Sequence, residues 1–96
     1  MAKLIAWEDI RPGMELFPER YRGEYPEGRL NPIFWDLDPV TILRVGEDGL
    51  RYSLYDFTSI RVYDHHRTPL IRWWQGKPSD DERRAAKWPE EVKQDG

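Results

Sequence analysis

The second half of the chain reads Val40-Thr-Ile-Leu-Arg-Val45, Gly46-Glu-Asp-Gly49, Leu50-Arg-Tyr-Ser-Leu-Tyr-Asp56, Thr58-Ser-Ile-Arg-Val-Tyr63 and, after a polar break, Leu70-Ile-Arg-Trp-Trp74. Apart from the glycine-bounded turn, these runs are rich in β-branched and aromatic residues, which favour strands. Turn residues separate the runs about every ten positions, as in sheets built from consecutive hairpins. The stretch therefore predicts four strands of an antiparallel β-meander, around which the rest of the chain closes.

Alternation along these strands predicts which side chains face the core, because successive side chains of a strand point to opposite faces of the sheet. The apolar set predicted to point inward is Val40, Ile42, Leu50, Tyr52, Leu54, Ile60 and Val62. The set predicted to point outward is Arg44, Arg51, Ser53, Arg61 and Tyr63. Trp73 and Trp74 are adjacent, so we expect one ring in the core and the other exposed.

Length and composition indicate one small globular domain. The chain has 96 residues, of which 39% are hydrophobic, and its 14% aromatic content supplies large buried areas per residue. It contains no cysteine, so we expect no disulfide, no thiolate nucleophile and no cysteine-bound metal. It shows neither the roughly 20-residue apolar run of a membrane span nor the apolar core of a secretion signal. These features predict a soluble cytoplasmic protein without a membrane partner.

The charges are unevenly distributed along the chain. The net charge is −3, which argues against a general DNA-coating role, because non-specific affinity for nucleic acid comes from neutralised phosphates. Residues 40–77 nevertheless carry +2, between flanks of −3 (residues 1–39) and −2 (residues 78–96). Eleven of the fifteen basic residues are arginine, the side chain suited to bidentate and stacked contacts. A GC-rich genome would produce the same bias.

The amino-terminal part predicts two strands joined by a turn. Residues 3–6 are expected to form a short strand, after which Trp7 and Ile10 face the same way across one helical turn. The sequence Arg-Pro-Gly-Met at residues 11–14 has proline where φ is preset and glycine where a positive φ is required, which favours a type II turn. The turn leads into a strand predicted at residues 14–17.

Residues 18–32 are predicted to form a long polar loop, which is uncommon in so small a domain unless it is functional or disordered. Tyr21 and Tyr25 either serve as recognition side chains in this loop or fold back to cover the end of the barrel. Residues 33–39 follow between prolines, and their alternation predicts an edge strand or an extended connector.

The carboxy-terminal segment predicts a short helix followed by a tail. We expect residues 1–77 to form the barrel domain and residues 78–96 to form the helix and a flexible acidic tail. Ser79 and Glu82 have the spacing of a capping box, and the helix is expected to run to Lys87. Ala85, Trp88 and Val92 would form a thin apolar stripe on this segment.

Asp64-His65-His66 resembles the signature of a phosphoesterase superfamily that uses paired divalent metals. The likeness covers three residues, those enzymes need further aspartate motifs, and adjacent histidines on a strand point to opposite faces. The alternative is a hairpin turn between Tyr63 and Leu70 with exposed histidines. The sequence has no Ser-His-Asp order, phosphate-cradling glycine loop or helical histidine pair. We therefore expect no catalytic residues, no metal site and no cofactor, and metal-dependent phosphoesterase is the least favoured function.

A basic and aromatic sheet face is the main functional candidate. Arginine and aromatic side chains on a small barrel bind single-stranded nucleic acid through backbone attraction and base stacking. The same residue types dominate protein–protein interfaces. Two further interpretations are a solvated face whose arginines pair with Asp56 and Asp64, and an aromatic cage for a methylated cation. The side chains predicted on the face are Arg44, Arg51, Arg61 and Tyr63, with Arg72, Trp74 and Lys77 at its margin.

Two runs resemble small, mostly uncharacterised β-barrel proteins of Src-homology type from actinobacteria and their phages. They are Ala6-Trp-Glu-Asp-Ile-Arg-Pro-Gly-Met14 and Gly49-Leu-Arg-Tyr-Ser-Leu-Tyr-Asp-Phe-Thr58. The resemblance implies a small, partly open barrel, and it ends at residues 18–32 and 79–96. It implies no activity, because the same barrel serves peptide, RNA, DNA and scaffold roles.

Together these observations predict a mainly β protein, a small, partly open antiparallel β-barrel of five or six strands with a short C-terminal helix. The predicted role is a non-enzymatic protein-binding module, a phage accessory protein that contacts a host or virion protein. Nucleic-acid binding through Arg44, Arg51, Arg61 and Lys77 is the alternative. The predicted binding residues are Tyr21, Tyr25, Arg44, Arg51, Arg61, Tyr63, Arg72 and Trp74.

Overall fold

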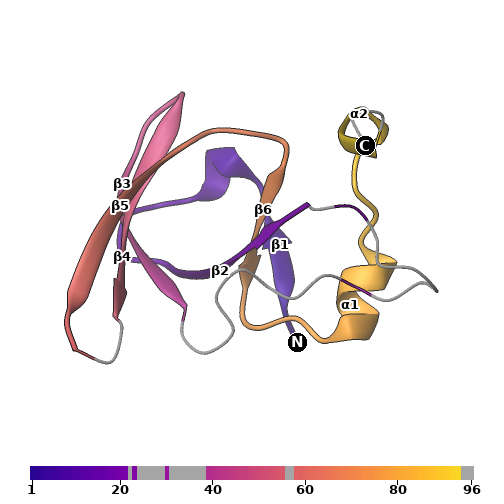
Figure 1. The fold of residues 1–96 in the computed structure, drawn as a ribbon, viewed down its shortest axis with the longest axis horizontal. Coiled ribbons are helices and arrows are strands. Elements are labelled where there is room, and N and C mark those ends of the chain that lie inside the picture. Colours follow the sequence, from indigo (N-terminus) through magenta and orange to yellow (C-terminus); the bar gives the residue numbers. More distant parts are fainter. Residues whose placement is uncertain (22, 24–29, 31–38, 56–57, 94–96) are drawn as a thin grey trace.

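The computed structural model describes residues 1–21, 23, 30, 39–55 and 58–93. Within these residues, six strands form one antiparallel sheet in the order β1-β6-β2-β3-β4-β5 (Figure 1). The sheet is not closed, so β1 and β5 are its edges, and the predicted mainly β, partly open architecture with a short C-terminal helix is confirmed. The elements are β1 (Lys3–Ile5), η1 (Trp7–Asp9), β2 (Glu15–Arg20), β3 (Val40–Val45), β4 (Gly49–Tyr55), β5 (Ile60–His66), β6 (Ile71–Gln75), α1 (Asp80–Ala85) and α2 (Glu90–Lys93).

Strand β2 joins the two halves of the sheet. Its first two residues, Glu15 and Leu16, pair with β3, whereas residues 17–20 pair with β6. Strand β1 lies on the other side of β6, and β3, β4 and β5 follow one another as a meander. In Figure 1 the meander is on the left, and both helices lie beyond the β1–β6–β2 half on the right. The helices therefore leave the meander uncovered.

The core draws its side chains from both halves of the sheet. Four of the side chains predicted to point inward are confirmed as buried: Val40 and Ile42 on β3, and Leu50 and Tyr52 on β4. Burial raises the pKa of the Tyr52 hydroxyl, so this side chain stays neutral. Ile5, Trp7, Met14, Val45 and Leu54 pack around the buried cluster, which consists of Ile10, Leu16, Val40, Ile42, Leu50, Tyr52, Ile71 and Trp73.

The fourth predicted strand of the meander lies elsewhere in the sheet. Strand β6 pairs with β1 and β2 and not with β5, because the chain crosses over after His66. The core covers one face of β6, and Glu19 with the carboxy-terminal segment covers the other, so Trp73 and Trp74 are both buried, and the expectation that one ring is exposed is wrong. Trp73 belongs to the core, and the Trp74 indole Nε1 donates a hydrogen bond to Glu19 on the opposite face.

Strand β2 extends three residues beyond its predicted end, into the segment predicted to be a loop. Pro18 lies inside the strand and pairs with Trp73. The Tyr21 amide donates to the Leu70 carbonyl at 2.7 Å, so by alternation the Pro18 nitrogen points away from β6. Because β3 pairs only with Glu15 and Leu16, the missing N–H of Pro18 removes no hydrogen bond between strands.

The predicted amino-terminal turn is confirmed. Gly13 has a φ of 92°, and the Met14 amide donates to the Arg11 carbonyl at 3.3 Å, as a type II turn requires. Ile10 is buried and Trp7 is half-buried against the core, so the two side chains do face the same way. The predicted edge segment at residues 33–39 lies, except for Pro39, outside the described residues.

The carboxy-terminal segment is held against the sheet by a buried carboxylate. Glu19 on β2 is 3% exposed and accepts hydrogen bonds from Arg72 at 2.7 Å, Trp74 at 2.8 Å and Arg83 at 2.9 Å. Burial by itself would raise the pKa of the Glu19 carboxyl, but these three hydrogen bonds outweigh it, and the pKa is lowered. Arg72 also donates to the Arg83 carbonyl at 3.1 Å, which fixes the end of α1.

The two helices differ in part from the single helix that was predicted. The Ser79–Glu82 capping box is confirmed, and both of its hydrogen bonds form. The first helix ends at Ala85, and a second begins after Pro89 and ends at Lys93, whereas residues 94–96 lie outside the described residues. Val92 is buried, so this member of the predicted apolar stripe does pack against the protein. No helix among the described residues is long and apolar enough to cross a membrane.

Candidate functional site

The outward side of the meander carries a set of side chains that no other helix or strand of the described residues covers. Strand register defines this outer face: Ser53 pairs with Val62 and Tyr55 with Ile60, and directly opposite residues of antiparallel strands share a face. Because Leu50 and Tyr52 point into the core, their neighbours in sequence on β4 point outward. The outer face therefore consists of Thr41, Arg44, Arg51, Ser53, Tyr55, Ile60, Val62, Asp64 and His66.

This register overturns the predicted orientation of β5. Arg61 and Tyr63 pair with Leu54 and Tyr52, so they lie on the core side, whereas Ile60 and Val62 lie on the outer face. The prediction followed hydrophobicity, and a shift of one residue exchanges the two faces of a strand. The predicted patch of Arg44, Arg51, Arg61 and Tyr63 is consequently divided between the two sides of the sheet.

The end of the outer face near the β4–β5 connection is apolar. Tyr55 is 63% exposed, Ile60 67% and Val62 54%. Tyr55 and Ile60 are cross-strand partners, and Val62 follows two residues along β5 on the same face, so the three side chains are neighbours. Strand β5 is also an edge of the sheet, and edge strands are sites where other chains can add.

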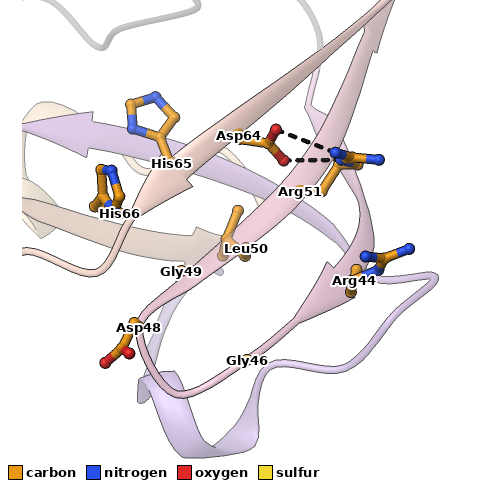
Figure 2. Close-up of a pocket in the computed structure, with 9 residues that line it drawn as sticks. All are labelled: Arg44, Gly46, Asp48, Gly49, Leu50, Arg51, Asp64, His65 and His66. Atoms are coloured by element: carbon orange, nitrogen blue, oxygen red, sulfur yellow. Dashed lines mark hydrogen bonds and ion pairs between the residues drawn. The ribbon is translucent and has the colours of Figure 1, made fainter.

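The other end of the outer face is basic. Arg44 and Arg51 are directly opposite each other on β3 and β4, and Asp64 on β5 is the next partner of Arg51. The Asp64 carboxylate accepts hydrogen bonds from Arg51 Nε at 2.8 Å and from Nη2 at 3.2 Å, a bidentate contact (Figure 2). The hydrogen bond from Arg51 lowers the pKa of Asp64, and the charges of Arg44 and His66 act in the same direction.

These basic side chains border a hollow of about 330 Å³ beside the β3–β4 turn, at the opposite end of β4 from the β4–β5 connection. Gly49 is in close contact with β5: a Cβ at this position would lie 2.6 Å from the His65 carbonyl oxygen. Figure 2 shows the hollow with the Arg51–Asp64 contact on one side and the two histidines on the other. Its lining residues are Arg44, Gly46, Asp48, Gly49, Leu50, Arg51, Asp64, His65 and His66.

The core side of β5 is largely taken up by aromatic stacking. The rings of Tyr63 and His65 stack on buried Tyr52 at centroid distances of 5.6 Å and 5.5 Å. Burial lowers the pKa of His65, with the positive charge of Arg20 acting in the same direction. Tyr63 is therefore partly a packing residue, which sequence reasoning had placed on the open face.

Asp64, His65 and His66 form part of β5 and not the predicted turn, because they pair with the first residues of β4. The Asp64 carboxylate is bonded to Arg51, and the two imidazoles alternate across the strand. Among the residues that the structure describes, no group of three or more His, Cys, Asp or Glu side chains is placed to hold a metal ion.

The remaining predicted binding residues lie away from the outer face. Tyr21 packs edge-on against Trp88 at 5.2 Å, which matches the alternative in which the tyrosine covers the barrel end. Arg72 is 4.3 Å from the centre of the Trp88 ring and bonds Glu19, and Trp74 is buried beside it, so neither borders a free arginine patch. Tyr25 lies outside the described residues.

A second hollow, of about 710 Å³, lies beside Trp7 between η1 and the β3–β4 turn. Arg67 sits over the Trp7 ring at 5.5 Å and bonds the Glu8 carboxylate at 2.7 Å. Arg11 donates to the carbonyls of Glu8 and Ile10. These charged groups already have partners within the protein, so this hollow is a weaker candidate than the outer face.

Sequence reasoning missed the apolar end of the outer face, since it placed Ile60 and Val62 in the core. A signal for the correct register does exist, because Tyr63 and His65 share one side of β5 and both have flat rings able to cover Tyr52. Comparisons with protein-family models, with curated proteins and with solved structures gave no match for this chain. The proposals below therefore rest on the geometry of the molecule.

Proposed function

We propose that this chain is a non-enzymatic protein-binding module whose contact surface is the outer face of β3, β4 and β5. The observation that carries the proposal is the cluster of Tyr55 on β4 with Ile60 and Val62 on the edge strand β5, each more than half exposed. The chain has few large aliphatic side chains, and leaving neighbouring ones in water costs hydrophobic free energy that a partner would recover.

The composition of the face suits a protein partner. Protein interfaces combine large apolar or aromatic anchors with arginine, and the outer face has both within two adjacent strands. Nucleic-acid binding is less favoured, because Arg61 lies on the opposite side of the sheet from Arg44 and Arg51, so the three do not form one track for a phosphate backbone. The resemblance to phage-encoded barrels makes a host or virion protein the first partner class to test.

The test is an affinity purification with tagged protein from a lysate of the encoding organism or its host, after nuclease treatment and at high salt. Ile60→Thr and Val62→Thr keep a β-branched side chain on the strand but remove exposed apolar surface. Leu4→Thr on β1, which replaces another exposed aliphatic residue at the opposite edge, is the matched control.

We expect a protein that is retained by the wild type and by Leu4→Thr and is lost from both outer-face variants. Retention by all three variants would move the interface elsewhere. Recovery of nucleic acid that is released at high salt would replace the proposal with the nucleic-acid alternative, because counterion release makes such binding steeply salt-dependent.

A further inference from the structure

The basic end of the outer face holds two like charges in direct opposition. Arg44 and Arg51 are cross-strand partners, and like charges at directly opposite positions destabilise a sheet. Two opposed arginines on an exposed strand pair are therefore not explained by sheet stability. An acidic group from outside the sheet would turn this repulsion into a binding site for an anion.

Asp64 forms hydrogen bonds with only one of the two arginines, although its charge also attracts Arg44. Both of its oxygens bond Arg51, at 2.8 Å and 3.2 Å. The Arg44 guanidinium, in contrast, forms no hydrogen bond or ion pair with any residue in the described part of the chain. Arg44, Arg51 and Asp64 together carry one positive charge in excess, and the second carboxylate of the hollow, Asp48, lies on the far side from Arg44 in Figure 2.

Arg44 also lies on the same face as the apolar cluster, so the two cannot be considered separately. A partner that covers Tyr55, Ile60 and Val62 and extends toward the hollow removes water from Arg44. Burying a cation without a counter-charge is costly, and the cost disappears when the partner supplies a carboxylate with good geometry.

We infer that the outer face binds an acidic amphipathic peptide segment of the partner protein, with a carboxylate on Arg44 and large apolar side chains on Tyr55, Ile60 and Val62. This inference rests on the proposed function and specifies the partner's chemistry. The four residue steps from Arg51 to Tyr55 on β4 span about 13 Å. The acidic and apolar positions of the partner are therefore about four residues apart in an extended segment, or about seven or eight apart in a helix, where two turns bring them to the same face.

The probe is a random-peptide display library, long enough to span this distance, selected on the immobilised full-length protein. Selected peptides are synthesised and titrated against the wild type and four variants. Arg44→Gln removes the uncompensated charge, and Asp64→Asn frees Arg51 from its internal partner. Ile60→Thr removes part of the apolar cluster. Arg84→Gln, an exposed arginine on α1 at the other end of the molecule, is the matched control for charge.

We expect selected peptides to be enriched in Asp or Glu together with large apolar residues. Arg44→Gln should weaken their binding by about tenfold or more, as for a charge pair removed from an interface. Asp64→Asn should strengthen binding, because a second guanidinium becomes available. Ile60→Thr should weaken binding, and Arg84→Gln should leave it unchanged.

Two failures have different meanings. Peptides that lose affinity with Ile60→Thr but show no acidic enrichment and no response to Arg44→Gln would overturn the inference and leave the proposed function standing. Peptides that are indifferent to Ile60→Thr, or a selection that yields none, would count against both. Arg44-dependent binding of a labelled oligodeoxythymidine without any peptide binding would also overturn both, in favour of nucleic acid.

Discussion

Replacing Glu19 with glutamine tests whether one buried carboxylate holds the carboxy-terminal helices on the sheet. The substitution keeps the side-chain volume and removes the charge. Arg72 and Arg83, whose side chains are 12% and 5% exposed, would then be buried without their shared counter-charge. Trp74 would also lose a charged acceptor for its indole N–H. Removing one partner of a buried ion pair costs about 3–5 kcal/mol, because the remaining charge is left uncompensated.

The lower end of this range applies to Glu19→Gln, because the amide oxygen still accepts one hydrogen bond. A loss of about 3 kcal/mol lowers the melting temperature of a domain of this size by roughly 12 °C or more. Urea unfolding followed by tryptophan fluorescence measures the loss of free energy. Hydrogen exchange should show the amides of α1 opening before those of β3 and β4, because Glu19 on β2 bonds Arg83 of α1 directly.

Glu15→Gln on the same strand is the matched control. Glu15 is exposed and has no ion pair with a described residue, so its substitution should change stability by less than about 0.5 kcal/mol. The stability of the protein should also depend on pH. The folded pKa of Glu19 lies below its ordinary value of 4.5, so its stabilising contribution is present above that value and is lost as pH falls through the folded pKa. A Glu19→Gln protein within 1 kcal/mol of Glu15→Gln, with unchanged acid sensitivity, would refute this account.

Three further predictions concern the hairpin, a histidine and a helix cap. Gly49→Ala should destabilise the fold by about 1–3 kcal/mol, because the new Cβ meets a backbone oxygen at 2.6 Å. Gly46→Ala is the control and should cost less, because the nearest atom to its new Cβ is at 3.7 Å. Equal urea midpoints for the two variants would contradict the close approach at Gly49. The pKa of His65 in the folded protein lies below 6.5, so as pH falls this imidazole is protonated first in the unfolded chain, and stability should decline below that value. Thermal melts should show this decline reduced in His65→Gln and retained in His66→Gln. Ser79→Ala should cost about 1 kcal/mol and Ser79→Asp much less, since aspartate also caps; helix loss by circular dichroism checks both, and similar losses would argue against the capping role.

Much of the fold could be predicted because its signals are local. The strand at residues 40–45, the Gly13 turn and the Ser79 cap depend on residue types within a few positions, and each formed as expected. Strand β2, which contains Pro18, extends beyond its predicted end. Proline is tolerated there because no strand pairs with β2 on the side to which the Pro18 nitrogen points. That absence is a property of the sheet and not of the local sequence.

The candidate site was predicted only in part, for a related reason. Arg44 and Arg51 were correctly placed outward, since they alternate with clearly apolar neighbours on β3 and β4. On β5 the two faces are Ile-Val-Asp-His and Arg-Tyr-His, and hydrophobicity favours placing the first set inside. The stacking of Tyr63 and His65 on Tyr52 decides the opposite orientation.

The sequence by itself determined the elements: the strands, the turns and the cap follow from propensities and periodicities that act over short distances. The tertiary structure alone decided which strands are edges, which face of β5 meets the core, and that both adjacent tryptophans are buried. These outcomes depend on contacts between residues far apart in the chain, such as Glu19 with Arg83 and Tyr52 with Tyr63, and many residues must already be in place before such contacts can form. The outer face, with its apolar cluster and its uncompensated arginine, exists only as a result of that assembly.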